Sequence, residues 1–425
     1  MANIGYTKYV DYSYKPGKDD LICSFYVEPE HGVGMEEAAG AVAAESSVGT
    51  WTEVSTTKPK VWDMSAKVFE LKSNWIKIAY PLALFELGNM PQIFSSVCGN
   101  IFGMKEVNNL RIEDIHWPKK LVNSFKGPLY GVSGVRKLLK IKERPLCGTI
   151  IKPKLGLNEK EHAKVAYDAW LGGLDIVKDD ENLTSQPFNR FEKRLKETVK
   201  LKEKAEKETG ERKMYMINVT AETKEMLRRA KLVKDIGNEY AMVDILTVGW
   251  SGLQTLREEN DKLKLVLHAH RAMHAALTRN KKHGISMMVL ADAARLIGVD
   301  QLHIGTGVGK MEGSMQEVKD IDLEVEKNIV KKHGHILAEN WEHMKPVFSV
   351  CSGGLHPGHI PKLVANLGKD IIIQAGGGVH GNPLGTKAGA TAMRQAIDAV
   401  MKGISLKEYA KTHKELNAAS EKWGF

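Results

Sequence analysis

GGLDIVKDDEN, at residues 172–182, places a short apolar run directly before a lysine and three carboxylates. The residues before it, Glu159–Leu171, have the apolar spacing of a helix. A helix followed by a buried strand with a charged far end is typical of α/β folds. The stretch therefore predicts that polar chemistry collects where the strands of this chain end.

The same alternation of strand and helix continues from about residue 140 onward. About eight strand–helix units in one domain of roughly 250 residues are typical of a TIM (β/α)8 barrel. An open doubly wound sheet is the alternative, but no dinucleotide-binding glycine pattern follows the first strand. We therefore predict a TIM-barrel catalytic domain at 128–425, in which Leu406–Phe425 forms one charged helix packed outside. The predicted strands are Gly148–Lys152, Leu174–Lys178, Met214–Val219, Met242–Thr247, Leu265–His270, Gln301–Ile304, Val347–Val350 and Ile371–Gln374.

The first part of the chain, residues 1–127, has a different rhythm. Short β-rich runs and two helices follow one another in the order β-α-β-β-α-β, which predicts an α+β ferredoxin-like domain ahead of the barrel. The predicted elements are the strands Leu21–Val27, Val68–Ser73, Trp75–Tyr80 and Leu110–Trp117 and the helices Met35–Ala44 and Met90–Gly99.

The composition is that of an ordinary globular protein, with 43% hydrophobic and 27% charged residues among 425. No apolar run approaches the ~20 residues of a membrane span, and the first residues do not resemble a signal peptide. The four cysteines form no C-x-x-C pair, which favours a reduced cytoplasm and no zinc site. The net charge of +9 is spread out and is not interleaved with aromatic residues, so we expect neither a nucleic-acid nor a membrane partner.

The end of the second predicted barrel strand, Lys178–Glu181, is a candidate metal site. Such a charged tetrapeptide is more often a surface cluster, but the apolar run before it indicates burial, and buried charges need a cation or each other. Carboxylate oxygens favour magnesium. A carbamate formed from carbon dioxide on Lys178 would supply a third oxygen anion, although the spacing alone supports this modification only weakly.

The fifth predicted strand ends in His268, His270 and Arg271. His-x-His puts two imidazoles on one face of a strand, which also suits a metal, and His268 is more often explained as a core histidine. Arg271 suits phosphate recognition because its guanidinium is planar and forked. With His303 at the end of the sixth strand, it forms a first candidate phosphate site.

Glycine pairs follow the last two predicted strands, at Gly353-Gly354 after Ser352 and at Gly376-Gly377. Each pair alone could be an ordinary tight turn. Together they form a second candidate phosphate site, because glycine lets backbone N–H groups approach an anion closely. Two phosphate sites imply a bisphosphorylated substrate.

Residues 305–313, GTGVGKMEG, place Lys310 between glycines. This pattern indicates a mobile lid that carries a lysine over the site. Its spacing is not that of a phosphate-binding P-loop. The alternative is a flexible loop with a lysine in solvent.

These stretches together resemble the large subunit of ribulose-1,5-bisphosphate carboxylase/oxygenase, and the similarity runs over essentially the whole chain. The matching stretches are 172–182, LHAHRAMH at 267–274, 305–313 and ESSVGTWT at 45–52. The resemblance implies addition of CO2 or O2 to the enediolate of ribulose-1,5-bisphosphate, with two 3-phosphoglycerate formed from CO2. The short chain and the runs GTIIKPK and QLHIG look like the archaeal form III branch. That branch implies nucleotide ribose salvage and no small subunit.

The resemblance also implies which residues hold the cofactor. Mg2+ would be bound by Lys178 in its carbamylated form, by Asp180 and by Glu181, with CO2 as the activating source of the carbamate. The carbamate would also remove the C3 proton of the substrate.

The other implied catalytic residues are Lys152, an acid and base near C2, His270, a proton shuttle, and Lys310, which closes over the incoming CO2. Lys154 would tune Lys152, and Asn100 would lie near the metal. The implied substrate-binding residues are Glu45, Thr50, Trp51, Asn100, Lys154, Arg271, His303, Ser352, Gly353, Gly354, Gln374, Gly376 and Gly377.

Four of these residues, Glu45, Thr50, Trp51 and Asn100, belong to the first predicted domain. In the family such residues reach the neighbouring subunit's barrel, and the glutamate pairs with the lid lysine. The resemblance therefore implies a homodimer, or a higher assembly of dimers, as the active form.

Three departures from the plant-type pattern stand out. Ile150 replaces a threonine, Gly307 replaces a valine in the lid, and the sequence ends at Phe425 without the longer tail that latches the lid there. We expect them to change carboxylation efficiency and discrimination against O2 rather than the chemistry.

Three other functions compete with this interpretation. A related enolase or isomerase would enolise a phosphorylated ketose without carboxylating it, but such relatives usually lack some of the residues above. An amidohydrolase barrel also uses His-x-His and a carbamylated lysine, yet places the histidines on its first strand rather than its fifth. A basic nucleic-acid scaffold would show steeply salt-dependent binding.

Overall fold

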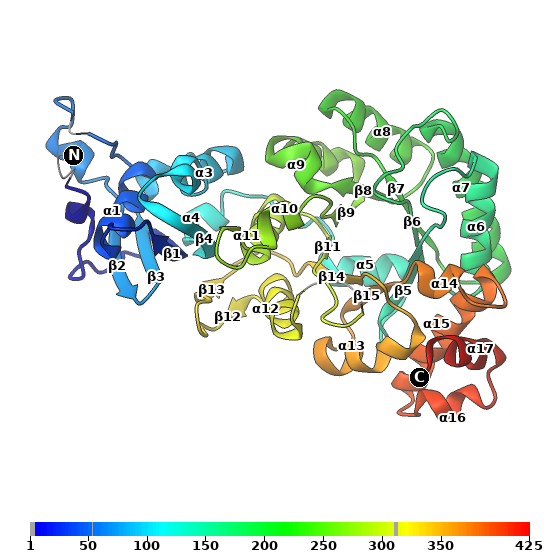
Figure 1. Cartoon of the computed structure of the whole chain (residues 1–425). Helices are drawn as coiled ribbons and strands as arrows, with labels where there is room; N and C mark the ends of the chain where they lie inside the picture. Colours follow the sequence, from blue (N-terminus) through cyan, green and yellow to red (C-terminus); the bar gives the residue numbers. More distant parts are fainter. Residues whose placement is uncertain (1–4, 53, 310–312) are drawn as a thin grey trace. The chain divides into compact units, whose positions relative to one another are not determined.

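The computed structural model describes residues 5–52, 54–309 and 313–425. The described chain forms two compact units, which are taken one at a time below (Figure 1). One contains the residues up to Gly127 together with 273–297 and 327–344, and the other contains 128–272, 298–326 and 345–425. Two segments from the predicted second domain thus pack in the first unit. The division into domains at 127/128 stays a prediction.

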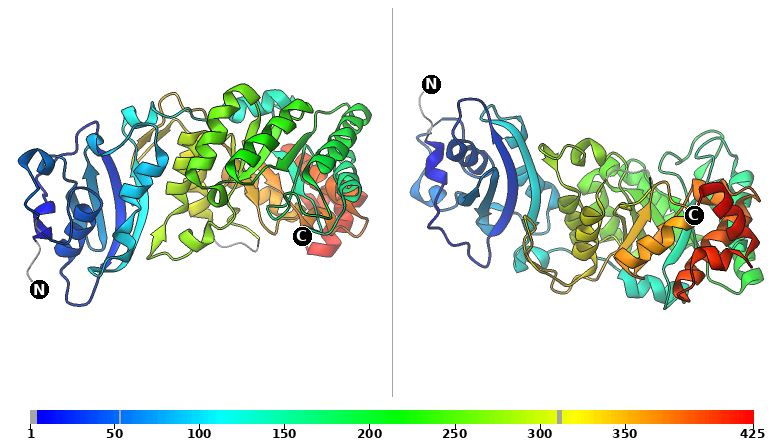
Figure 2. Two further views of the ribbon diagram at one scale, coloured as in Figure 1. Left: turned by 90° about the horizontal axis from the view of Figure 1, so that it is seen from above. Right: turned by 60° about the horizontal axis from the view of Figure 1, so that its bottom comes forward.

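The second unit is built on a closed barrel of parallel strands, in the order β11-β14-β15-β5-β6-β7-β8-β9 (Figures 1 and 2). This confirms the predicted TIM barrel. The strands are nearly continuous apolar runs because both of their faces are covered, as is usual for parallel sheets. Their bounds are β5 (Leu146–Ile150), β6 (Ile176–Lys178), β7 (Met214–Asn218), β8 (Tyr240–Asp244), β9 (Val266–His270), β11 (Gln301–His303), β14 (Phe348–Ser352) and β15 (Ile371–Gln374).

Helices alternate with these strands along the chain. The helix α6 starts where the sequence predicts, because Asn158 and Glu161 form a reciprocal capping box at its first turn. The helices of this unit are α5 (Gly131–Leu139), α6 (Glu159–Leu171), α7 (Phe191–Thr209), α8 (Thr223–Asp235), α9 (Ile245–Leu263), α12 (Met315–Glu326), η4 (Pro357–His359), α13 (Ile360–Leu367), α14 (Gly377–His380), α15 (Thr386–Met401), α16 (Leu406–Ala410) and α17 (Lys414–Trp423).

The amino-terminal end of the barrel is closed by apolar side chains. Val135 and Leu139 of α5 pack in one cluster with residues from the beginnings of the strands. This cluster excludes water from that end and leaves the carboxyl ends of the strands for polar chemistry. Its other members are Leu146, Ile176, Met214, Met216, Tyr240, Met242, Val266, Phe348, Val350 and Ile372.

Two predicted elements of this unit are wrong in part. The predicted strand Met242–Thr247 ends at Asp244, and α9 begins at Ile245. The β-branched residues that suggested a longer strand lie in the first turn of α9, where Thr247 Oγ1 donates to the Asp244 carbonyl oxygen at 3.0 Å. The predicted single helix Leu406–Phe425 is two helices, α16 and α17, because the chain turns at residues 411–413.

The first unit contains a sheet with the order β10-β4-β1-β3-β2. The four strands β4-β1-β3-β2 are antiparallel neighbours, which confirms the predicted ferredoxin-like arrangement. The fifth strand, β10, was not predicted, and it joins β4 in parallel. The bounds are β1 (Leu21–Pro29), β2 (Lys67–Lys72), β3 (Trp75–Tyr80), β4 (Val107–His116) and β10 (Gly284–Ile285).

The remaining elements of this unit are short apart from α1, α3 and α11. Helix α11 packs on β4, and the Trp117 Nε1 donates to Asp292 Oδ2 at 3.2 Å. No helix among the described residues is long and apolar enough to span a membrane. The remaining elements of the first unit are η1 (Tyr6–Tyr9), α1 (Met35–Glu45), α2 (Pro59–Trp62), η2 (Leu82–Leu84), α3 (Met90–Val97), η3 (Asn100–Gly103), α4 (Lys119–Val122), α10 (Ala275–Thr278), α11 (Met287–Ile297), β12 (Ile329–Val330) and β13 (Glu339–Asn340).

Candidate active site

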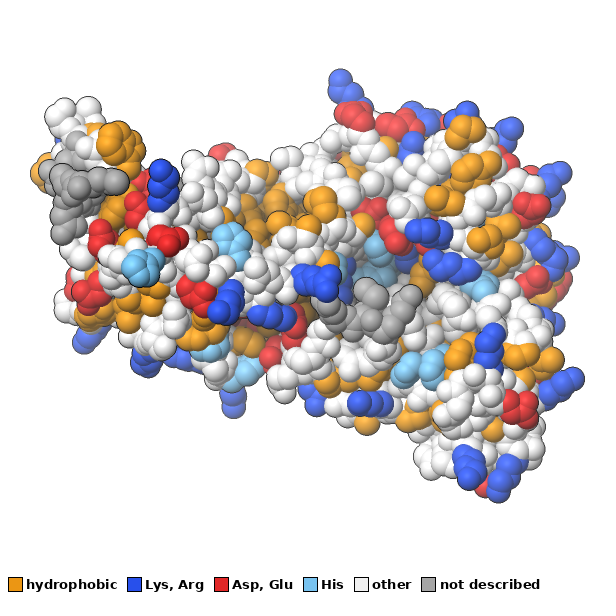
Figure 3. All heavy atoms as spheres, viewed as in Figure 1, with side chains coloured by type: hydrophobic (Ala, Val, Ile, Leu, Met, Phe, Trp, Pro, Cys, Tyr) orange, Lys and Arg blue, Asp and Glu red, His pale blue; other side chains and the backbone are white. Residues whose placement is uncertain are grey.

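The carboxyl ends of the barrel strands bring together charged side chains that lie far apart in the sequence. Histidine, acidic and basic side chains gather over the ends of β6, β8 and β9 in the space-filling view (Figure 3). Paired parallel strands place these ends side by side: Ile150 lies opposite Lys178, and Asp244 lies opposite His270.

Lys178, the last residue of β6, has 0% of its surface exposed. Its Nζ donates to the Asp179 carbonyl oxygen at 2.8 Å and lies 3.1 Å from the sulfur of Met242. Burial lowers the pKa of Lys178, although the charges of Glu181 and Asp244 oppose this shift. A lowered pKa favours the neutral amine, which is the form that can attack carbon dioxide.

Asp180 and Glu181 follow Lys178 and face two other predicted site residues. Asp180 Oδ2 accepts a hydrogen bond from Lys152 Nζ at 2.6 Å. Burial raises the pKa of Asp180, but the hydrogen bonds from Lys152 and Asn182 outweigh it and lower the pKa overall. Glu181 Oε2 lies 3.6 Å from His270 Nε2. The end of β6 therefore presents two carboxylates that face cationic or titratable neighbours.

Asp179 has a supporting role that the sequence did not indicate. It points away from its two neighbours and accepts hydrogen bonds from His162 Nε2, Tyr215 Oη, Arg194 Nε and the Asn218 backbone N–H, at 2.8 to 3.1 Å. Although burial opposes it, the charge of Arg194 and the His162 hydrogen bond lower the pKa of Asp179 to about 2. This buried network fixes the backbone between Lys178 and Asp180.

Asp244 is a second supporting residue that sequence reasoning missed. Its Oδ1 lies 2.7 Å from His270 Nδ1. The Ala272 N–H also points at Nδ1, at 3.2 Å, but the shorter contact with a carboxylate favours the tautomer that carries its proton on Nδ1 and leaves Nε2 for chemistry. The Thr220 Oγ1 in turn accepts from the Asp244 backbone N–H at 2.9 Å.

His268 is a core histidine, as its alternative interpretation proposed. It is fully buried between Gln301 Oε1 and His303 Nε2, each at 2.9 Å. Burial lowers the pKa of both His268 and His303 well below the usual range, helped by the charge of Lys178 on His268 and that of His270 on His303.

Arg271 lies against the end of β11, because a Cβ atom on Gly305 would be 3.1 Å from its guanidinium nitrogen. Burial lowers the pKa of Arg271 to about 10, so the side chain stays cationic at neutral pH. Arg271 and His303 therefore come from adjacent strands, as a shared phosphate site requires.

The glycine turns lie on the paired strands β14 and β15, where Ser352 is opposite Gln374. Gly353 and Gly354 have φ values of 127° and 71°, which only glycine adopts readily. Gly376 lies close to Lys152, since a Cβ atom there would be 3.1 Å from the lysine Cε. Gly377 begins α14, and Gln374 is buried with its Nε2 3.7 Å from the Met216 sulfur.

The predicted lid is described only in part. Lys310 lies outside the described residues. Gly309 is close to the turn after β14, because a Cβ atom there would lie 2.9 Å from the Gly353 carbonyl oxygen. Gly307 has a φ of 56°, and a Cβ atom would lie 2.7 Å from the Met315 Cα. A valine at this position would be strained in this loop conformation.

Lys154 is exposed beyond the end of β5.

Four more predicted residues belong to the first unit. Glu45 accepts a hydrogen bond from the Tyr6 hydroxyl at 3.3 Å, and burial raises its pKa. Thr50 lines a cavity of about 220 Å³. Trp51 is 70% exposed, and Asn100 is exposed at the start of η3.

Among residues 5–52, 54–309 and 313–425, no group of three or more histidine, cysteine or carboxylate side chains is arranged so that it could hold a metal ion without further change. The residues at the end of β6 nevertheless fit a hard cation. The Lys178 Nζ is buried against a carbonyl oxygen and a thioether, and the side chains of Asp180 and Glu181 could supply oxygen ligands. A carbamate on Lys178 would complete three anionic oxygens, the donor type that magnesium prefers.

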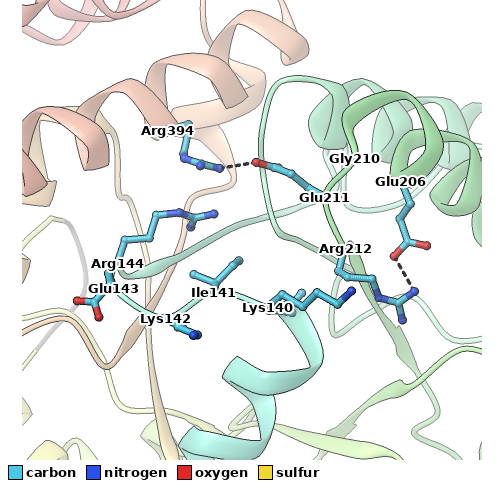
Figure 4. Close-up of a pocket in the computed structure, with 11 residues that line it drawn as sticks. Lys140, Ile141, Lys142, Glu143, Arg144, Glu206, Gly210, Glu211, Arg212 and Arg394 are labelled. Atoms are coloured by element: carbon cyan, nitrogen blue, oxygen red, sulfur yellow. Dashed lines mark hydrogen bonds and ion pairs between the residues drawn. The ribbon is translucent and has the colours of Figure 1, made fainter.

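A pocket of about 570 Å³ lies at the other end of the barrel, between the residues that precede β5 and β7 (Figure 4). Its arginines already have carboxylate partners. Arg144 donates to both oxygens of Asp175 at 2.7 Å, and Arg394 lies 3.4 Å from Glu211. We assign this pocket no part in the chemistry.

Comparison with known proteins identifies the family of the chain. Residues 131–423 match the family described as ribulose bisphosphate carboxylase large chain, catalytic domain, and residues 8–121 match its N-terminal domain. The chain is 54% identical over 421 residues to a ribulose bisphosphate carboxylase of Methanosarcina barkeri, covering 98% of both proteins.

Solved structures give the same result. The dimeric archaeal Rubisco from Hyperthermus butylicus matches with a TM-score of 0.93 and 49% identity, over 99% of both chains. The octameric Rubisco from Pyrococcus horikoshii, in complex with sulfate ion, matches with a TM-score of 0.92 and 49% identity, over 99% of this chain and 97% of that one.

Proposed function

Because the chain belongs to the ribulose bisphosphate carboxylase large-chain family, we propose that it is a ribulose-1,5-bisphosphate carboxylase/oxygenase of the archaeal form III type. One observation carries the proposal beyond family membership. Lys178, Asp180 and Glu181 lie at one strand end, with Lys152 and His270 in contact with the two carboxylates.

The substrate binds through its two phosphates. Arg271 and His303 hold one, with Ser352 beside it. Gly353 and Gly354 hold the second phosphate through their backbone N–H groups. Their place after β14, at the carboxyl end of the barrel strands, is suited to phosphate binding. Gly376, Gly377 and Gln374, with Thr50 and Trp51 from a neighbouring subunit, complete that second phosphate site.

The cofactor is Mg2+, held by Asp180, Glu181 and a carbamate on Lys178. When bound, the metal and the carbamate would polarise the C2 carbonyl and supply a base for the C3 proton. Asp179 would keep the ligands in place through its buried hydrogen bonds, and Asn100 of a neighbouring subunit would lie near a bound metal.

Two side chains of this chain move protons around the substrate. Lys152 is an acid and base near C2, with Asp180 beside its Nζ and Lys154 tuning it. His270 shuttles protons at Nε2, because Asp244 keeps the proton of Nδ1. Addition of CO2 to the enediolate, hydration and cleavage between C2 and C3 then give two 3-phosphoglycerate. Lys310 stabilises the new carboxylate, and Glu45 of a neighbouring subunit pairs with that lysine.

The proposal is tested by incorporation of labelled bicarbonate into 3-phosphoglycerate from ribulose-1,5-bisphosphate. We expect two molecules of 3-phosphoglycerate for each CO2 taken up. If the protein exchanges the C3 proton of the substrate with solvent but never makes 3-phosphoglycerate, it is an enolase or isomerase, and the proposal is wrong.

We expect Asp244→Asn to lower kcat by about 10- to 100-fold, the usual loss when the partner that orients a functional histidine is changed. An amide can donate to His270 Nδ1 and so favour the wrong tautomer. Steady-state carboxylation kinetics measure the effect. Thr220→Val is the control, because it removes a contact with Asp244 and none with His270. Equal losses in both variants would contradict the orienting role.

The active unit is proposed to be a homodimer or a higher assembly of dimers, without small subunits. Glu45, Thr50, Trp51 and Asn100 belong to a different compact unit from the proposed metal ligands, and the related solved structures are a dimeric and an octameric Rubisco. We further propose that the enzyme works in the cytoplasm in nucleotide ribose salvage, as its resemblance to the archaeal form III branch implies.

A mixing experiment tests the shared site. We expect an equal mixture of Lys178→Ala and Asn100→Ala chains to regain about a quarter of wild-type activity, because random pairing leaves one intact site in half of the dimers. Neither variant alone should be active. Subunit exchange is followed with two fluorescent labels. Full exchange without any return of activity would contradict the shared site.

A further inference from the structure

The two glycine turns at the end of the barrel contact each other through their backbones. A Cβ atom on Gly378 would overlap the Leu355 carbonyl oxygen and lie 2.8 Å from the His356 Cα. The distance between the turn after β14 and the short helix α14 is therefore set by this backbone contact.

The end of α17 contacts both turns from outside the barrel. The Trp423 ring lies parallel to the His356 ring, with centroids 5.4 Å apart and an interplanar angle of 8°. Phe425 lies beside the same histidine, at 5.7 Å and 18°. Lys422 Nζ donates to the Gly381 carbonyl oxygen at 2.5 Å, directly after α14. One helix end thus contacts the η4 turn through two rings and α14 through a hydrogen bond.

The contact with η4 is tight. A Cβ atom on Gly358 would lie 2.6 Å from the Phe425 ring, so the ring packs directly on that backbone. His356 Nδ1 accepts from the Gly358 N–H at 3.3 Å, and His359 Nδ1 accepts from the His356 N–H at 3.2 Å. Burial, followed by the charge of His359, lowers the pKa of His356 to about 4. The stack therefore contains a neutral imidazole at physiological pH, and no cation is buried under the rings.

We propose that Trp423, Phe425 and Lys422 are positioning residues for one substrate phosphate. They hold η4 and α14 together, and thereby keep the glycine pairs at 353–354 and 376–377 at the spacing that a phosphate requires. The inference rests on the proposed function, which assigns those glycines to that phosphate. The three residues touch neither substrate nor metal ligands and act only through the turns.

The test compares Trp423→Ala with Trp423→Phe, which keeps an aromatic ring on His356. We expect Trp423→Ala to raise the KM for ribulose-1,5-bisphosphate roughly tenfold with kcat nearly unchanged, since misplaced binding groups weaken ground-state and transition-state binding alike. Trp423→Phe should restore most of the affinity. Lys422→Met removes the hydrogen bond to Gly381 and the ammonium that lies 5.6 Å from the Trp423 ring, but keeps both rings on His356. It is the milder variant if Trp423→Ala does not fold.

Tyr409→Ala is the matched control. It removes a similar stack, between Tyr409 and His413 at 3.8 Å and 13°, on the neighbouring helix α16. We expect it to destabilise the protein without changing KM. If KM rose equally in Tyr409→Ala and Trp423→Ala, the rise would be explained by a general loss of stability. That result would overturn the proposal.

Hydrogen exchange supplies a readout that does not depend on turnover. In Trp423→Ala the amides of residues 353–359 and 377–381 should exchange faster than in wild type, with the strands β14 and β15 unchanged. Faster exchange with an unchanged KM would also overturn the proposal. If the wild type makes no 3-phosphoglycerate, the proposed function fails, and calorimetric binding of ribulose-1,5-bisphosphate to the same variants then decides the inference separately.

Discussion

Lys178→Ala is expected to lower carboxylation by at least about 10³-fold, because it removes both the proposed metal ligand and the base that the proposed carbamate would supply. Asp180 and Glu181 remain, but two carboxylates, one of which is paired with Lys152, are a poor site for a divalent cation. Wild-type activity should rise on preincubation with CO2 and Mg2+ together. The variant should not respond to either.

A direct measurement of the metal separates loss of the site from loss of the fold. Binding of Mn2+, followed by electron paramagnetic resonance, should strengthen with bicarbonate in the wild type and not in Lys178→Ala. Lys178→Met keeps the side-chain length in the buried space and checks that the lost volume is not the cause. Lys202→Ala is the matched control, since this lysine is also buried, on α7, away from the strand ends. Full metal-dependent activity in Lys178→Ala would rule out the carbamate.

The barrel was predictable because its strands leave a strong signal in the sequence. Parallel strands covered on both faces are unbroken apolar runs, such as IIIQ at Ile371–Gln374, whose predicted bounds match β15. Charged residues that end such runs must meet at one end of the barrel. The contacts of Lys152 with Asp180 and of His270 with Glu181 are what this geometry provides.

Asp244 was missed for a local reason. The residues Ile245–Val248 are β-branched or apolar and extend the strand pattern past Asp244, so the aspartate looked like an internal residue. In the structure it ends β8, opposite His270. Where a strand is followed directly by a helix, the same few residues fit the apolar pattern of either element. The periodicity of so short a stretch cannot separate the two.

Asp179 and the segments 273–297 and 327–344 were missed because they depend on contacts between distant residues. The sequence does not distinguish Asp179 from its acidic neighbours, and only the positions of His162, Arg194 and Tyr215 show that its carboxylate faces away from theirs. Likewise β10 is two residues long and exists because it pairs with β4. No local pattern encodes either arrangement.

Lys310→Ala is expected to lower 3-phosphoglycerate formation by about 10²–10³-fold, or about 3–4 kcal/mol, the usual loss when one contact to a developing charge is removed. It should leave exchange of the C3 proton with solvent largely intact. The reason is the order of events. In the proposed mechanism the enediolate forms beside Lys178 and Lys152, at the ends of β6 and β5, before the new carboxylate exists. The negative charge that Lys310 is proposed to stabilise, that of the new carboxylate, appears only after CO2 has added.

The position of the loop supports a role for its lysine in this second step. Gly309, the residue before Lys310, lies against the Gly353 carbonyl oxygen, in the turn proposed for a substrate phosphate. A compact ammonium brought over a closed site would stabilise the new carboxylate in surroundings with little water. Lys310→Arg should recover little activity, because a planar fork occupies the space differently.

Proton exchange and product formation, measured on one preparation of Lys310→Ala, give the decisive pair of rates. Lys319→Ala is the control, because this lysine also follows β11, on α12, and changes the charge equally. It should lower neither rate. Loss of both rates in Lys310→Ala would mean that the lysine acts in enolisation, and normal carboxylation would mean that the new carboxylate does not depend on it. Retained exchange without product identifies Lys310 as the residue that turns a site able to enolise ribulose-1,5-bisphosphate into one that fixes CO2.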